Sequence, residues 1–169
     1  MIINRVWASP SKWTFTIKPI AELVSRYVGD GRGWVDPFAG MNSPAQITND
    51  MDTEMPTMYH MEAEEFCRSL PGSYDGVLVD PPYSYRQISE HYRGRGIKAT
   101  YKDTSYNFYK RVYKEIAPKI KEGGVAISCG WNSNGVGKCE GFDVIEVLLV
   151  AHGLHHNDTI VTVERKRTV

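Results

Sequence analysis

Two apolar segments near the end of the chain are separated by a short connection, and this spacing restricts the possible folds more than any other feature. Residues 143–151 and 158–165 have the composition of strands, and only a few residues, from His152 to Asp158, join them. A parallel crossover needs a dozen or more residues, so the two strands must form an antiparallel hairpin. Five further short apolar segments precede the hairpin, at 33–36, 46–49, 57–60, 75–80 and 124–129.

Helical segments alternate with these strands. We expect helices at Pro19 to Tyr27, at Ala63 to Leu70 and at Ser105 to Lys121, the last of which precedes a Gly123-Gly124 stop. This alternation, followed by a terminal hairpin, predicts an α/β fold with a seven-stranded, mostly parallel sheet. The length of 169 residues is that of one domain, residues 1–169.

Two connections are too short to hold the usual covering helices. Only about five residues separate Gly40 from the second strand, and Met51 to Pro56 is equally short, whereas crossovers in parallel sheets need at least roughly 10 to 12 residues. The sequence therefore predicts a reduced helix set on one face of the sheet. A bare apolar face implies a partner, either a second copy or another subunit, unless the N-terminal segment lies across it.

Composition excludes several classes of protein. Hydrophobic and charged residues make up 41% and 24% of the chain, no apolar stretch is long enough to span a bilayer, and Met1 to Ser9 lacks the layout of a signal peptide. We therefore expect a cytoplasmic protein without membrane contact. The three cysteines are scattered without CxxC spacing, which indicates buried small side chains and neither disulfides nor a metal site.

Charge is distributed unevenly although the net charge is zero. Residues 85–121 contain ten basic and three acidic side chains, interleaved with seven aromatic ones. Such surfaces hold phosphates and stacked bases, although a solvated helix face with ordinary core aromatics is equally compatible with the pattern. We interpret residues 84–121 as a substrate-contacting segment.

Unusual residues follow the predicted parallel strands, where ligands bind in sheets of this type. The sequence Asp80-Pro81-Pro82-Tyr83 comes directly after the apolar run Val77-Leu78-Val79, and the two prolines fix the turn. The Asp80 carboxylate and the Pro81 carbonyl can accept both hydrogens of an exocyclic amino group, while the Tyr83 ring offers a stacking face. Both contacts would aim the nitrogen lone pair at an electrophile such as a methyl sulfonium.

The chain resembles the amino-group DNA methyltransferases, in particular the short adenine-specific enzymes of phages and prophages. The resemblance implies a Rossmann-like class I fold that uses S-adenosylmethionine and yields S-adenosylhomocysteine. Seven segments carry it in the family's order: Thr16-Ile17-Lys18-Pro19-Ile20, Asp36-Pro37-Phe38-Ala39-Gly40, Thr48-Asn49-Asp50, Tyr59-His60-Met61-Glu62-Ala63, Asp80-Pro81-Pro82-Tyr83-Ser84, Gly130-Trp131-Asn132-Ser133 and His156-Asn157-Asp158-Thr159.

The resemblance also implies roles for individual residues in cofactor binding. The loop of Asp36, Phe38, Ala39 and Gly40 would wrap the methionine part of the cofactor, with Asn42 or Ser43 adding a contact because no further glycine follows. Asp50 would bind the ribose hydroxyls, with Asp52 as the alternative. Glu62 would lie near the adenine amino group and Lys18 near the cofactor carboxylate. Asp80, Pro81, Pro82 and Tyr83 would form the catalytic group, with Asp80 also at the cofactor.

The implied reaction is methylation of adenine N6 in DNA, on a base flipped out of the helix. The side chains expected to contact the nucleic acid are Tyr83, Ser84, Arg86, Arg93, Arg95, Lys98, Trp131 and Asn132. For Trp131 and Asn132, packing and turn formation remain the alternative. RNA base methylation and a non-catalytic, nucleic-acid-binding subunit are the competing functions. His152, His155 and His156 cluster in the hairpin loop with no fourth ligand nearby, so we expect no metal.

Overall fold

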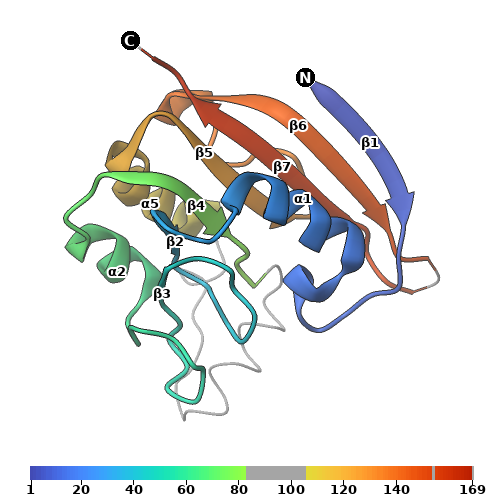
Figure 1. Ribbon diagram of the computed structural model, residues 1–169, viewed down its shortest axis with the longest axis horizontal. Coiled ribbons are helices and arrows are strands. Elements are labelled where there is room, and N and C mark those ends of the chain that lie inside the picture. Colours follow the sequence, from blue (N-terminus) through green and yellow to red (C-terminus); the bar gives the residue numbers. More distant parts are fainter. Residues whose placement is uncertain (83–105, 154, 169) are drawn as a thin grey trace.

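The described strands form one sheet in which a single strand runs antiparallel to its neighbours. The computed structural model describes residues 1–82, 106–153 and 155–168. The sheet has seven strands in the order β1-β6-β7-β5-β4-β2-β3 (Figure 1). Their bounds are β1 Ile2–Trp7, β2 Trp34–Asp36, β3 Ile47–Thr48, β4 Tyr74–Val79, β5 Ile120–Gly130, β6 Phe142–Ala151 and β7 Thr159–Lys166. Only β7 runs antiparallel to its neighbours β5 and β6, which confirms the mostly parallel sheet with a C-terminal hairpin.

The identity of the seventh strand differs from the prediction. Residues 57–60 form no strand; a single parallel bridge joins Asn49 to Tyr59. With β3 only two residues long, little edge remains for another strand to pair with. The seventh strand is instead β1, which pairs in parallel with β6 along its whole length. Its apolar residues do not alternate, and most of its side chains are exposed at the sheet edge, so the period-2 signal of a half-buried strand is missing.

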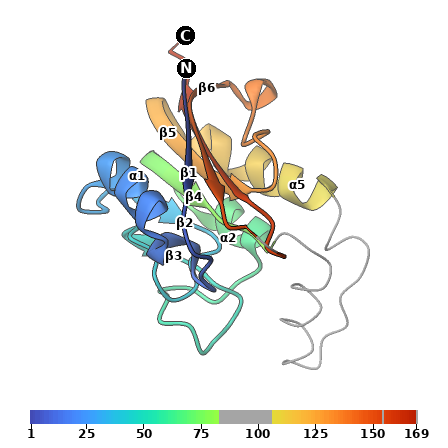
Figure 2. The same cartoon turned by 90° about the vertical axis from the view of Figure 1, so that its right-hand side faces the viewer.

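Each face of the sheet has its own set of helices (Figure 2). Helix α1 (Lys18–Val28) lies on one face, where Ile20, Leu23 and Val24 pack against side chains from β2, β4, β5, β6 and β7. Helices α2 (Ala63–Ser69) and α5 (Tyr106–Ile116) lie on the other face. Within the described residues no helix lies between β2 and β3 or between β3 and α2, as the short connections predict, and the N-terminal helix α1 covers one face of the sheet.

Helix α5 ends earlier than expected. Pro118 cannot continue an α-helix, so a 3₁₀ turn over Ala117–Lys119 follows, and β5 begins at Ile120 opposite Tyr74. The Lys166 ammonium group donates to the carbonyls of Ala117 and Ile120, at 2.8 and 2.7 Å. The predicted helix to Lys121 is therefore wrong by one turn, and the Gly123-Gly124 pair lies within β5 rather than in a stop.

A buried carboxylate holds the connection from β5 to β6. Glu164 on β7 is fully buried and accepts the backbone N–H groups of Val136 at 2.6 Å and Gly137 at 2.9 Å. A Cβ atom at Gly135 would lie 2.1 Å from this carboxylate, so only glycine fits there. Burial raises the pKa of Glu164. Backbone donors thus anchor a crossover whose regular structure is one 3₁₀ turn, Lys138–Glu140.

His152 has a structural role in the hairpin loop. Its side chain is buried, with one ring nitrogen 2.8 Å from the Ala8 carbonyl and the other 2.8 Å from the Thr159 hydroxyl. The ring therefore joins the end of β1 to the start of β7. Within the described residues no group of three or more metal-ligating side chains comes together, and no helix there is long and apolar enough to cross a membrane.

Candidate active site

The candidate site lies at the carboxyl ends of β2, β3, β4 and β5. Asp36 is the last residue of β2, and Asp80 follows the last residue of β4. Because Val79 pairs with Ser128, the turn after β4 runs beside the end of β5, where Trp131 follows. The parallel strands thus bring loops that are far apart in sequence to one edge of the sheet.

Asp36 is a buried carboxyl group held by two donors. It has no exposed surface; the Phe38 N–H donates to Oδ1 at 2.9 Å, and the Ser43 hydroxyl donates to Oδ2 at 2.6 Å. Burial outweighs these hydrogen bonds, and together with the nearby Asp80 and Asp50 carboxylates it raises the pKa of Asp36 to about 7. Asp50 and Asp80, two further acidic groups predicted for the site, are therefore close enough to Asp36 to affect its ionisation.

Asp50 orders the glycine loop directly. Its Oδ2 accepts the Gly40 N–H at 3.0 Å, and its Oδ1 accepts the Asp52 N–H at 2.7 Å. Asp52 instead accepts the N–H of Glu54 within its own turn, at 3.1 Å. Of the two candidates for the ribose, Asp50 thus accepts a hydrogen bond from the loop after β2.

Gly40 is enclosed by the N-terminal segment. Its φ of 53° lies in the left-handed region, and a Cβ atom there would come within 3.1 Å of the Trp13 ring. Trp13 precedes α1, which begins at Lys18. The segment before α1 thus lies over the loop after β2, which brings the exposed Lys18 side chain to the same end of the sheet.

Asn49 was not predicted as a site residue, yet it ties two site loops together. It is fully buried, and its amide donates to the carbonyls of Pro37 at 3.1 Å and Met61 at 3.0 Å. The Met61 N–H donates back to the Asn49 carbonyl oxygen at 2.9 Å. One side chain thereby fixes the loop after β2 to the residue before Glu62. Its sequence signal was its place in the segment Thr48-Asn49-Asp50 at the end of a predicted strand, which assigns it no role of its own.

The remaining predicted cofactor residues vary in exposure. Ala39 is buried beneath the loop, and its N–H donates to the backbone carbonyl of Asn49 at 2.9 Å. Phe38 is partly buried, and its ring packs edge-to-face against the Phe108 ring, with 6.4 Å between the ring centroids. Asn42 and Glu62 are exposed, with Glu62 at the position before α2.

In the predicted catalytic turn, the structure describes residues 80–82, which two prolines and a hydrogen bond from α5 restrain. Asp80 is partly buried and Pro81 is buried, close to the fully desolvated Cys129 thiol, whose pKa burial raises well above its usual value. The Tyr109 hydroxyl on α5 donates to the Pro82 carbonyl at 2.5 Å. Tyr109 was predicted only as part of an aromatic run, because no sequence pattern links positions 27 residues apart.

Trp131 and Asn132 lie beside this turn. Trp131 keeps 46% of its surface exposed, which excludes a role as a packed core tryptophan. Asn132 is exposed, and its side-chain oxygen accepts the Asn134 N–H at 3.0 Å, as in a turn. The other predicted substrate contacts lie outside the described residues: Tyr83, Ser84, Arg86, Arg93, Arg95 and Lys98.

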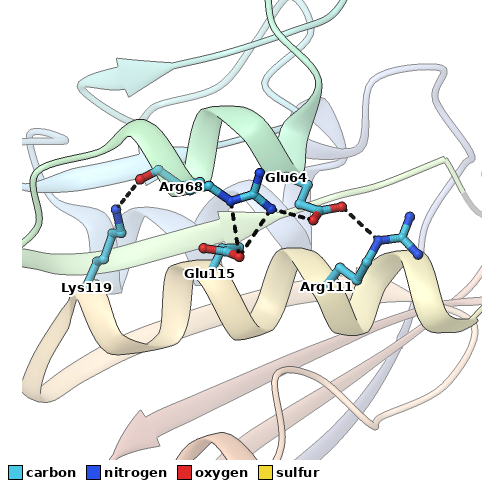
Figure 3. Close-up of polar contacts among 5 residues, drawn as sticks. All are labelled: Glu64, Arg68, Arg111, Glu115 and Lys119. Atoms are coloured by element: carbon cyan, nitrogen blue, oxygen red, sulfur yellow. Dashed lines mark hydrogen bonds and ion pairs between the residues drawn. The ribbon is translucent and has the colours of Figure 1, made fainter.

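An ion-pair ladder joins α2 to α5 below the site (Figure 3). Glu64 pairs with Arg68 and Arg111, both at 2.7 Å, and Arg68 also pairs with Glu115 at 3.4 Å. The Lys119 ammonium group donates to the backbone carbonyls of Arg68 and Leu70 at the end of α2. These charges pair with one another and join the two helices. Three of them, Glu64, Arg68 and Arg111, line a groove of about 330 Å³ together with Glu62, Glu65 and Phe108.

The cysteines are only partly as expected. Cys67 and Cys129 are buried and free, as predicted, whereas Cys139 is free but exposed. Cys139 lies in the 3₁₀ turn before β6, where the short crossover leaves it outside the core.

No protein-family model and no curated protein sequence matches the chain. Solved structures do match its fold. TrmN from Thermus thermophilus superimposes with a TM-score of 0.60 at 16% identity, over 89% of this chain and 49% of TrmN. The chain thus spans about half the length of TrmN.

Two shorter proteins show the same likeness. The 1,6-didemethyltoxoflavin-N1-methyltransferase from Burkholderia thailandensis, solved with S-adenosylhomocysteine, has a TM-score of 0.59 at 12% identity, over 89% of this chain and 78% of that one. An rRNA methylase from Streptococcus thermophilus has a TM-score of 0.52 at 9% identity, over 87% and 94% of the two chains. At such identities the likeness concerns the fold alone. The chain therefore has the Rossmann-like fold of the class I S-adenosylmethionine-dependent methyltransferases.

Proposed function

We propose that the protein transfers a methyl group from S-adenosylmethionine to the exocyclic N6 amino group of adenine in DNA. The observation that carries the proposal is the convergence of Asp36, Asp50 and Asp80 beside a Pro-Pro turn at the carboxyl edge of a methyltransferase-type sheet. The specific choice of adenine and DNA rests on the resemblance of the Asp80-Pro81-Pro82-Tyr83 turn and its flanking segments to the phage enzymes.

The residues present fit the cofactor in charge and in shape. S-adenosylmethionine carries a positive sulfonium, which the carboxylates of Asp50 and Asp80 favour electrostatically. Gly40 presents bare backbone in a left-handed conformation, where a side chain would meet Trp13. Asp50 lies next to that backbone, in position to accept hydroxyl hydrogens. When bound, the cofactor would supply the electrophilic methyl group.

The protein's own contribution is to hold the amino group. The Asp80 carboxylate and the Pro81 carbonyl would each accept one amino hydrogen, so that the nitrogen lone pair points away from both. Such positioning is the main requirement of the reaction, since the nucleophile needs no strong base. Trp131, half-exposed beside the turn, offers an apolar surface to the target base or its neighbour.

RNA is the second candidate substrate, because one of the matching structures is an rRNA methylase. A third reading is a non-catalytic subunit that keeps the fold and binds nucleic acid while a partner methylates. We also propose that the protein binds DNA and that it associates with a second copy of itself or with another subunit.

Methyl transfer from labelled cofactor to unmethylated DNA tests the proposal, with RNA of the same sequence as competitor. We expect label in DNA with the wild type and none with Asp80→Ala. Asp75→Asn is the matched control, because Asp75 is exposed and lies near the amino end of β4, the strand whose carboxyl end Asp80 follows. Cofactor binding without transfer to either polymer would support the non-catalytic reading, and stronger competition by RNA would reassign the substrate.

A further inference from the structure

Strand β1 forms an open edge of the sheet (Figure 1). Among the described residues, no strand pairs with its outer side. The strand is six residues long, keeps one register with β6 without a bulge, and contains neither proline nor lysine. Proteins usually protect a sheet edge with such residues, with bulges or with a covering segment, because the N–H and C=O groups of an edge pair readily with another strand.

The apolar side chains of this edge are exposed. Ile2, Ile3 and Trp7 keep 55%, 60% and 69% of their surfaces accessible. Val6 packs against the core beside α1, so the even-numbered residues of β1 face the α1 side of the sheet and the odd-numbered residues face the other side. Both faces of the edge therefore offer apolar surface to a further strand.

The direction of the backbone groups follows from one hydrogen bond at the end of the strand. The Ala8 N–H donates to the Ala151 carbonyl of β6 at 3.0 Å. In a strand, the N–H and C=O groups of one residue point to the same side, and the side alternates from residue to residue. Even-numbered residues therefore bond to β6, and Ile3, Arg5 and Trp7 direct their backbone groups to the open edge.

We propose that this edge binds a second copy of the chain, with β1 antiparallel to β1, so that the two sheets become one. A two-fold axis normal to the sheet brings the same edge of both copies together with their faces on the same side. Residues opposite one another then share a face, so the axis must pass through one residue and its own copy. The pairing closes as a dimer, because the strand at the other end of the sheet, β3, has only two residues.

Arg5 selects the register of this pairing. An axis through Arg5 would set two guanidinium groups directly opposite each other, which is destabilising. An axis through Asn4 places Ile3 opposite the partner's Arg5, two residues whose backbone groups both point outward and can exchange N–H···O bonds. The same axis places Ile2 opposite the partner's Val6, and the two Asn4 amides face each other and can hydrogen-bond.

Two further observations favour a second copy as the occupant. The net charge of the chain is zero, so two copies do not repel each other at long range. The candidate active site lies at the carboxyl ends of β2, β3, β4 and β5, so β1 pairing leaves it open in both copies. The inference therefore does not depend on the proposed methyl transfer, and either can fail without the other.

Sedimentation of the full chain over about 1 to 200 μM tests the dimer. We expect a Kd on the order of 10 μM, because one six-residue edge is small beside standard interfaces of roughly 1,200 Å² or more. Arg5→Pro removes an outward N–H group and no bond to β6, so it should raise the Kd at least roughly tenfold. Arg5→Ala is the matched control; it keeps the N–H group and should still dimerise.

The outcomes of this experiment decide between occupants. A wild type that stays monomeric at the highest concentration would overturn the proposal and assign the edge to a strand of another protein. An equal Kd for Arg5→Pro and Arg5→Ala would also overturn it, because the dimer would then form elsewhere on the surface.

Disulfide formation tests the register in variants that keep every backbone donor. All carry Cys139→Ser, because Cys139 is exposed. With oxidised glutathione, Asn4→Cys should form a disulfide dimer, since residues opposite each other at such a position have Cα atoms about 4.5 Å apart. Ile2→Cys lies on the same face, but its two copies would be offset by about 13 Å along the strands and should stay unlinked. Equal yields from both variants on a non-reducing gel would refute the register and with it the proposed pairing.

Discussion

The substitution Asp36→Asn should change how stability depends on pH. Asp36 has a pKa raised to about 7 by burial, against an ordinary value of 3.8. A carboxyl group with a raised folded-state pKa stabilises the fold below its unfolded pKa, and this contribution is lost as the pH rises through the folded value. The difference of about 3 pKa units corresponds to roughly 4 kcal/mol, lost at about 1.4 kcal/mol per pH unit between pH 4 and 7.

Asparagine should remove this dependence without breaking the local contacts. Its oxygen can accept the Phe38 N–H, and its amide can donate to the Ser43 hydroxyl oxygen once that hydroxyl rotates. The other groups titrate in both proteins, so their contribution cancels in the difference between the two free energies of unfolding. We therefore expect similar free energies of unfolding near pH 4 and a variant that is more stable by up to about 4 kcal/mol at pH 8.

Urea unfolding followed by circular dichroism from pH 4 to 8 measures this difference. Asp75→Asn is the control, since Asp75 is exposed and pairs only at the surface with Lys121. A difference that stays constant across the pH range, or one that grows toward low pH, would refute the reasoning that a buried, protonated Asp36 lies at the site.

Three further perturbations test the site. Asn49→Ala removes three hydrogen bonds that the buried Asn49 side chain makes between two loops. The free energy of unfolding should therefore fall by about 3 kcal/mol and the melting temperature by roughly 6 to 12 °C. A shift below 2 °C by calorimetry would contradict the structural role of Asn49. Trp131→Ala should weaken oligonucleotide binding by roughly 5- to 100-fold, measured by fluorescence anisotropy, while stability changes by less than about 0.5 kcal/mol; unchanged affinity would remove Trp131 from the substrate surface. Neutralising Arg93, Arg95 and Lys98 together should reduce the slope of log affinity against log salt by up to about 2.7, and an unchanged slope would argue against phosphate contacts there.

Most of the fold could be predicted because its signals are local. The short link between β6 and β7 required a hairpin, and Pro19, which suits the first turn of a helix, marked the start of α1. Strand β1 escaped notice because an exposed edge strand needs no alternation. The composition of residues 57–60 predicts a strand, but composition does not reveal whether the neighbouring strand is long enough to pair with it. The structure has a single bridge there, at Tyr59.

The acids of the site could also be predicted, since each lies at or just after the carboxyl end of a predicted strand. The residues that hold the loops around these acids could not be predicted. Asn49 and Tyr109 act through hydrogen bonds to backbone carbonyls, which leave no mark on the sequence of the partner. The position of the segment before α1 over the loop at Gly40 is likewise a tertiary contact, made by Trp13, that the sequence does not show.

The most direct test of the central claim is to identify the methylated nucleoside. DNA without prior methylation would be incubated with the protein and S-adenosylmethionine, digested to nucleosides and analysed by mass spectrometry, beside Asp80→Ala and Asp75→Asn. The account predicts N6-methyladenine in DNA treated with the wild type or Asp75→Asn and none with Asp80→Ala. Methyl groups on another base, or product that persists in Asp80→Ala, would contradict it.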